Sequence, residues 1–226
     1  MKLKLMKYIA LVGVLCAAFT LQIALGGMIS VSATDSDGHP VAATANFTFS
    51  AGTLSLTLSN DIANTAWISP GQSLSDFSFT LSNGTTSGGS LTSITGTAIN
   101  IDADGNVTPG TPVSSTDWGL SANSSSTFLL TALIGGQPDY MIAPSGASFP
   151  NVNMGVDNFN PYLLTGPVTF TIAGDFTADT TISGATFSFG TAPETFVSTP
   201  DSGTTAALLG LAMIGLAAFR TKFRKA

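Results

Sequence analysis

Basic side chains are almost absent from the 226-residue chain, which contains 7 Lys and Arg residues against 13 Asp and Glu residues. No Lys or Arg occurs between Tyr8 and Phe219. The cations stand at the two ends of the chain, as Lys2, Lys4, Lys7, Arg220, Lys222, Arg224 and Lys225. A body without cations cannot neutralise phosphates, which excludes nucleic acid as its partner. Its acidic residues favour cations as counter-ions instead.

Cysteine and histidine are equally scarce, with one of each, Cys16 and His39. Cys16 lies in the first apolar segment, so the rest of the chain has no thiol and depends on its core and strand ladders for stability. We expect His39, beside Gly38 and Pro40, to be solvated rather than to act as a general base. Without Lys, Arg or Cys, the body also lacks most groups that activate a serine nucleophile. The sequence therefore predicts neither an enzyme nor a cofactor.

Residues 1–33 are predicted to form a helical signal peptide. A basic start precedes an apolar stretch from Tyr8 to Leu25, and Val31-Ser32-Ala33 supplies small residues at the positions that signal peptidase reads. We therefore expect signal peptidase to cut near Thr34. Because the apolar part is long, an uncleaved membrane anchor is the alternative.

The last residues, 198–226, have the pattern of a second targeting segment. Thr204–Phe219 is an apolar run of 16 residues, which makes a transmembrane helix of ~24 Å, short of the ~30 Å hydrocarbon core. Arg220 and Lys222 can close this gap by snorkelling. The positive-inside rule keeps the tail 220–226 cytoplasmic, together with the N-terminal lysines. The acidic body between the two ends is then the part that crosses the inner membrane.

A short motif precedes this helix, Thr199-Pro200-Asp201-Ser202-Gly203. The order of motif, apolar helix and Arg/Lys terminus resembles the sorting signal of PEP-CTERM proteins, in the variant that reads Val-Pro-Asp-Ser-Gly. Thr199 departs from that variant, which has Val at its position. The resemblance implies that an exosortase processes the chain near the motif and passes it to the surface or extracellular matrix of an outer-membrane bacterium that makes exopolysaccharide. A plain anchor with a basic end is the alternative.

Residues 34–197 read as an all-β ectodomain. Phe47 and Phe49 alternate with polar residues, as do Leu54, Leu56 and Leu58, which is the period of a half-buried strand. A two-residue turn at Ala51-Gly52 pairs Phe49 with Leu54, Phe47 with Leu56 and Ala45 with Leu58, so turn and pattern agree on one register. Further alternating segments give these expected core residues: Val168, Phe170, Ile172, Phe187 and Phe189. We expect an antiparallel β-sandwich of roughly seven to nine short strands, with loops at about 107–126 and 135–166.

The segment Asn100–Thr111 admits two interpretations. Asn100, Asp102 and Asp104 stand at alternate positions before Gly105, a spacing of oxygen ligands that suits Ca²⁺. Thr111 stands where a calcium loop needs a bidentate Glu, however, and Asp-Gly also favours a plain β-turn. Asp35-Ser-Asp-Gly38 has the same Asp-x-Asp-Gly pattern, but fewer residues with side-chain oxygens surround it.

Together these features predict an exported, non-enzymatic surface or matrix protein. Its partners would be signal peptidase, an exosortase, the inner membrane and exopolysaccharide. A carbohydrate-binding module or adhesin is the alternative, and it would need exposed rings from the following set: Trp67, Trp118, Tyr140 and Tyr162. A secreted glycoside hydrolase is a further alternative, which would need two facing carboxylates from the following set: Asp117, Asp139 and Asp157.

Overall fold

The part of the chain that the structure describes folds as twelve strands joined in one hydrogen-bonded sheet. The computed structural model describes residues 27–35, 37–82, 89–122, 124, 126–134, 138–152, 163–190 and 196–198. The strands are β1 Gly27–Thr34, β2 Pro40–Ser50, β3 Thr53–Asn60, β4 Leu74–Leu81, β5 Ser90–Ile101, β6 Val107–Pro109, β7 Gly119–Ala122, β8 Thr127–Thr131, β9 Met141–Ala143, β10 Leu163–Ala173, β11 Ile182–Phe189 and β12 Phe196–Ser198. A 3-10 turn covers Pro70–Gln72. The all-β prediction is confirmed.

The predicted transmembrane helix 204–219 and residues 1–26 of the predicted signal-peptide helix lie outside the described residues, whereas the helix expectation is wrong for residues 27–33. Within the part of the chain that the structure describes, no helix has the length and apolarity needed to cross a membrane. Residues 27–34, most of which the sequence assigns to the signal peptide, form strand β1.

The β2–β3 hairpin has the register that the sequence predicts. Phe49 pairs with Leu54, Phe47 with Leu56 and Ala45 with Leu58. Gly52 closes the turn at φ 75°, a left-handed conformation that glycine adopts without steric cost. Because side chains alternate across a strand, this register puts every large apolar residue of the hairpin on the inner face.

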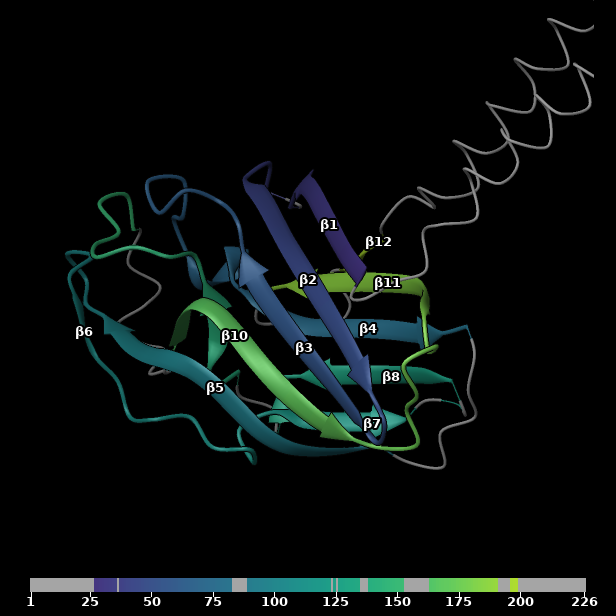
Figure 1. The fold of residues 1–226 in the computed structure, drawn as a ribbon. Coiled ribbons are helices and arrows are strands. Elements are labelled where there is room, and N and C mark those ends of the chain that lie inside the picture. The colour runs from purple at the N-terminus through teal and green to yellow at the C-terminus, as the bar shows by residue number, and fades with distance from the viewer. Residues whose placement is uncertain are drawn as a thin grey trace, which may run out of the picture.

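The sheet has two arms that meet at β9. One arm runs β1-β2-β3-β10 with β5 and β6 beyond β10, and the other runs β12-β11-β4 with β8 and β7 beyond β4. In Figure 1 the first arm lies obliquely in front of the second. β9 pairs parallel with β10 and antiparallel with β4 at Leu74↔Ile142. Two separate antiparallel sheets are therefore not confirmed, since a short parallel pairing joins the arms into one mixed sheet.

The core fills the space between these arms. The Phe47 ring of β2 lies 5.7 Å from that of Phe77 and 6.0 Å from that of Phe79 on β4, measured between centroids. The other predicted core residues are buried as expected: Leu54, Leu56, Val168, Phe170, Ile172, Phe187 and Phe189. Phe49 is only partly buried; it stands beside the turn at Ala51-Gly52, where its ring centroid lies 5.8 Å from that of Phe176.

Candidate functional site

The turn between β5 and β6 is built around one carboxylate. Asp102 Oδ1 accepts hydrogen bonds from the backbone N–H of Asp104 at 2.9 Å and of Asn106 at 2.8 Å. Asp102 Oδ2 accepts a third from the Asn106 side-chain amide at 2.9 Å. Two backbone bonds, from Gly105 N–H to the Asp102 carbonyl and from Asp102 N–H to the Asn106 carbonyl, complete the loop. This is an Asx-type turn, in which the side chain replaces a backbone acceptor.

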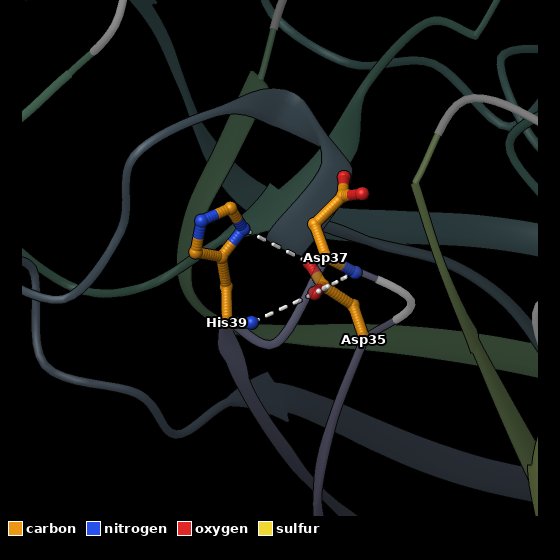
Figure 2. Close-up of side chains that lie close together, drawn as sticks. All are labelled: Asp35, Asp37 and His39. Atoms are coloured by element: carbon orange, nitrogen blue, oxygen red, sulfur yellow. Dashed lines mark hydrogen bonds and ion pairs between the residues drawn. The ribbon is translucent and has the colours of Figure 1, made fainter.

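The turn between β1 and β2 repeats this arrangement. Asp35 Oδ1 accepts from the backbone N–H of Asp37 at 2.9 Å and of His39 at 2.8 Å. Gly38 N–H donates to the Asp35 carbonyl, and Asp35 N–H donates to the His39 carbonyl. His39 Nδ1 lies 3.4 Å from Asp35 Oδ2, where the first turn has its Asn106 amide. Figure 2 shows the Asp35 carboxylate held between the His39 ring and these backbone groups.

The two glycines differ sharply in their surroundings, although both have positive φ, 84° at Gly38 and 78° at Gly105. A Cβ added to Gly38 would meet nothing within 4 Å, whereas one on Gly105 would lie 2.0 Å from the Phe149 carbonyl oxygen. Phe149 N–H also donates to the Gly105 carbonyl at 2.8 Å. The β5–β6 turn is thus docked on the loop around Phe149, whereas the space beside Gly38 in the β1–β2 turn is open.

Hydrogen bonding also sets the charge state of the docked turn. The bonds from the Asn106 side chain and backbone, with smaller ones from Asp104 and Gly105, hold the pKa of Asp102 below its usual value of 3.8. These donors stabilise the ionised carboxylate more than the neutral acid. Asp102 therefore serves as an ionised acceptor for its own turn.

The structure brings together part of the predicted calcium set. Asp102 and Asp104 share the turn, but Asn100 lies in β5, where it pairs with Thr108. The side chain that contacts the Asp102 carboxylate is that of Asn106, which the sequence interpretation did not include. Asn106 could have been included from sequence, because it stands two residues after Asp104 and the turn places alternate residues around one centre.

A second group of oxygen and nitrogen ligands was ranked lower from sequence. One ligand atom each from Asp35, Asp37 and His39 lies within 4.8 Å of the others. These atoms offer two carboxylates and an imidazole, a donor set suited to a divalent metal. The Asp35 oxygens already hold the turn backbone and the His39 ring, so Asp35 has a structural role like that of Asp102.

The rings proposed for sugar binding belong mainly to the core. Trp67 is buried and donates from Nε1 to Ser73 Oγ at 3.1 Å. Trp118 is buried and donates from Nε1 to the Tyr140 carbonyl at 3.1 Å. Tyr140 is 6% exposed, and its hydroxyl donates to the Thr111 carbonyl at 3.2 Å. Tyr162 lies outside the described residues. The three described rings thus stabilise the loops between strands.

Two of the three predicted hydrolase carboxylates, Asp117 and Asp139, lie among the described residues. Asp117 Oδ2 accepts from the backbone N–H of Ser114 at 2.6 Å and closes a local turn. Asp139 precedes the buried strand β9, and Asp157 lies outside the described residues.

The sorting residues 199–203 and the basic residues 220–225 also lie outside the described residues, so comparison with known families carries the interpretation there. A family model, the VPDSG-CTERM motif, matches residues 200–223. The chain carries a PEP-CTERM-type C-terminal sorting signal. The matched range includes Pro200-Asp201-Ser202-Gly203 and begins just after Thr199, the position at which the sequence departs from the motif's name. Neither the curated proteins nor the solved structures gave a match.

Proposed function

We propose that this protein is an exosortase substrate, exported across the inner membrane and released from a membrane-anchored precursor to the cell surface or extracellular matrix. The observation that carries the proposal is the VPDSG-CTERM motif at residues 200–223. The motif, the apolar run and the basic tail stand in the order of a three-part sorting signal. Signal peptidase acts at one end of the chain and exosortase at the other.

The distribution of charge supports this route. The cations are confined to residues 2–7 and 220–225, and every acidic residue lies between them. Basic segments beside apolar runs remain on the cytoplasmic side, whereas a body without cations offers no such barrier to export. This separation of basic ends from an acidic body fits a chain whose two ends stay on the cytoplasmic side while the body crosses the membrane.

We propose a non-enzymatic role for the ectodomain. The carboxylates of Asp35 and Asp102 hold the backbone N–H groups of their own turns. Trp67, Trp118 and Tyr140 pack inside the fold, which weakens the sugar-binding alternative built on exposed rings. A β-rich domain displayed at the surface is the role that these features support.

The motif can be tested in a host that encodes an exosortase. Pro200→Ala combined with Asp201→Ala should leave export intact but hold the protein in the inner-membrane fraction. Thr199→Val, which restores the motif's first residue, is the matched control and should be sorted like the native chain. Fractionation followed by immunoblotting of inner membrane, outer membrane and medium gives the readout.

Two results would contradict the proposal. One is surface delivery of the double variant at the native level. The other is unchanged sorting of the native chain in the same host after deletion of its exosortase.

A further inference from the structure

Strand β1 is a fully paired part of the fold. It pairs antiparallel with β2 at every position from Gly27↔Phe47 to Thr34↔Pro40. Its alternate residues face inward: Val31 is 8% exposed and belongs to the core, and Ile29 and Ala33 pack against that core. In Figure 1, β1 lies beside β2 at the edge of the front arm.

The β1–β2 turn joins β1 directly to β2. Asp35 gathers the Asp37 and His39 N–H groups, and its own N–H returns to the His39 carbonyl. These bonds reverse the chain so that Thr34 meets Pro40. A chain cut just before Thr34 would keep the residues of this turn but lose the strand that the turn positions.

The cut expected after Val31-Ser32-Ala33 would remove nearly all of β1. Strand β2 would then have an unpaired edge, and the inward-facing Ala43 and Ala45 would lose their neighbours Val31 and Ile29. Because the mature fold would lack the pairing of β1 with β2 and these core contacts, the structure argues against cleavage after Ala33.

An earlier site is present in the sequence. Ala24-Leu25-Gly26 has small residues at the two positions that signal peptidase reads, and it ends directly before Gly27, the first residue of β1. A cut after Gly26 gives a leader within the usual ~15–30 residues, whereas a cut after Ala33 exceeds that range.

We propose that signal peptidase cuts between Gly26 and Gly27, so that the mature protein begins with strand β1. The proposal rests on the export route proposed above. Once the C-terminal tail with Lys222 and Lys225 has also been removed, the mature body has a single primary amine, the α-amino group of Gly27, because no lysine occurs between Tyr8 and Phe219. Gly27 lines a hollow of about 310 Å³ together with residues that include Met28, Phe47, Phe49 and Ile182.

The single amine allows a direct test on exported protein. The protein is labelled with an amine-reactive reagent, denatured and digested with a protease that cuts before Asp. Because Asp35 is the first acidic residue, the expected labelled peptide is Gly27–Thr34. A labelled amine on Thr34, or on Met1, would overturn the proposal. The C-terminus of the same sample reports sorting independently, so a failure at one end is distinguishable from a failure at the other.

A matched pair of variants adds a functional readout. Gly26→Val places a β-branched side chain where a small residue is needed, and most of the protein should accumulate with its leader attached. Ala33→Val makes the same kind of change at the alternative site and should leave cleavage unchanged. The reverse pattern, with Ala33→Val blocking cleavage and Gly26→Val being processed normally, would overturn the assignment.

Discussion

The two Asp-x-Asp-Gly turns allow the packing of the β5–β6 turn to be measured against an internal control. Gly38 and Gly105 have the same backbone role and similar positive φ values, so replacing either with Ala costs about 1–2 kcal/mol in left-handed strain. Only Gly105 is enclosed: its added Cβ would lie 2.0 Å from the Phe149 carbonyl oxygen and 2.8 Å from the carbonyl carbon. The backbone at Phe149 would have to move.

That movement has two further costs. It weakens the hydrogen bond from Phe149 N–H to the Gly105 carbonyl, a loss of about 0.5–1.5 kcal/mol. It also disturbs the packing of Phe149, whose buried ring lies 4.9 Å from that of Trp67, centroid to centroid, and overpacking of this kind costs about 1–3 kcal/mol. Gly105→Ala should therefore destabilise the protein by roughly 2–4 kcal/mol more than Gly38→Ala.

Thermal unfolding of the two variants and the native protein tests this difference. At ~2–4 °C per kcal/mol for a domain of this size, Gly105→Ala should melt roughly 5–15 °C below Gly38→Ala. Urea unfolding should give the same order with unchanged m-values, which would show that only stability has changed. Equal losses for the two variants would refute the docking of the β5–β6 turn against Phe149.

Three further outcomes are expected from unfolding experiments on this body. Phe47→Ala should cost about 3–5 kcal/mol by urea unfolding, and Phe49→Ala clearly less, because Phe49 is partly exposed; equal costs would contradict the packing. The pKa of Asp102 is lowered, so the ionised carboxylate stabilises the folded protein at neutral pH, and this stabilisation is lost as the pH falls below the usual value of 3.8 and through the lower folded pKa. Asp102→Asn should remove that part of the dependence of stability on acid pH. An unchanged pH profile of stability in Asp102→Asn would contradict this role. CaCl₂ and NaCl of equal ionic strength should raise the melting temperature equally by screening acidic repulsion; a larger effect of Ca²⁺ that disappears in Asp102→Asn with Asp104→Asn would instead establish a calcium site.

The β2–β3 hairpin could be predicted from sequence because its information is local. Ala51-Gly52 specifies a tight turn, and the alternation from Phe47 to Leu58 allows one register in which all the apolar residues share a face. The inward-facing residues of β10 and β11 followed from the same alternation. Phe49 was the exception, because its burial depends on how far the opposite arm extends over the hairpin end.

The topology could not be predicted in the same way. β9 is a three-residue strand, Met141–Ala143, in a stretch that the sequence assigns to a loop, and three residues are too few to show a period. Its parallel pairing with β10 and its contact with β4 at Leu74 depend on contacts distant in sequence. The short strands β6 and β7 lie in the other predicted loop, 107–126, and were missed for the same reason.

The candidate sites likewise divide into features that depend on local sequence and features that depend on the folded conformation. The sorting motif is a local pattern, and the family match at residues 200–223 confirms it. The partnership of Asp102 with Asn106 depends on the turn conformation, and the docking of Gly105 on Phe149 depends on packing between segments far apart in the chain.

The most direct test of sorting uses the absence of Lys and Arg from the body. Surface protein from the native host is denatured and treated with trypsin, and its intact mass is measured before and after. If both ends have been processed, trypsin finds no site between Tyr8 and Phe219, and the mass should not change. A surface protein that still carries Arg220, Lys222 and Arg224, and that trypsin shortens at its C-terminus, would contradict exosortase processing.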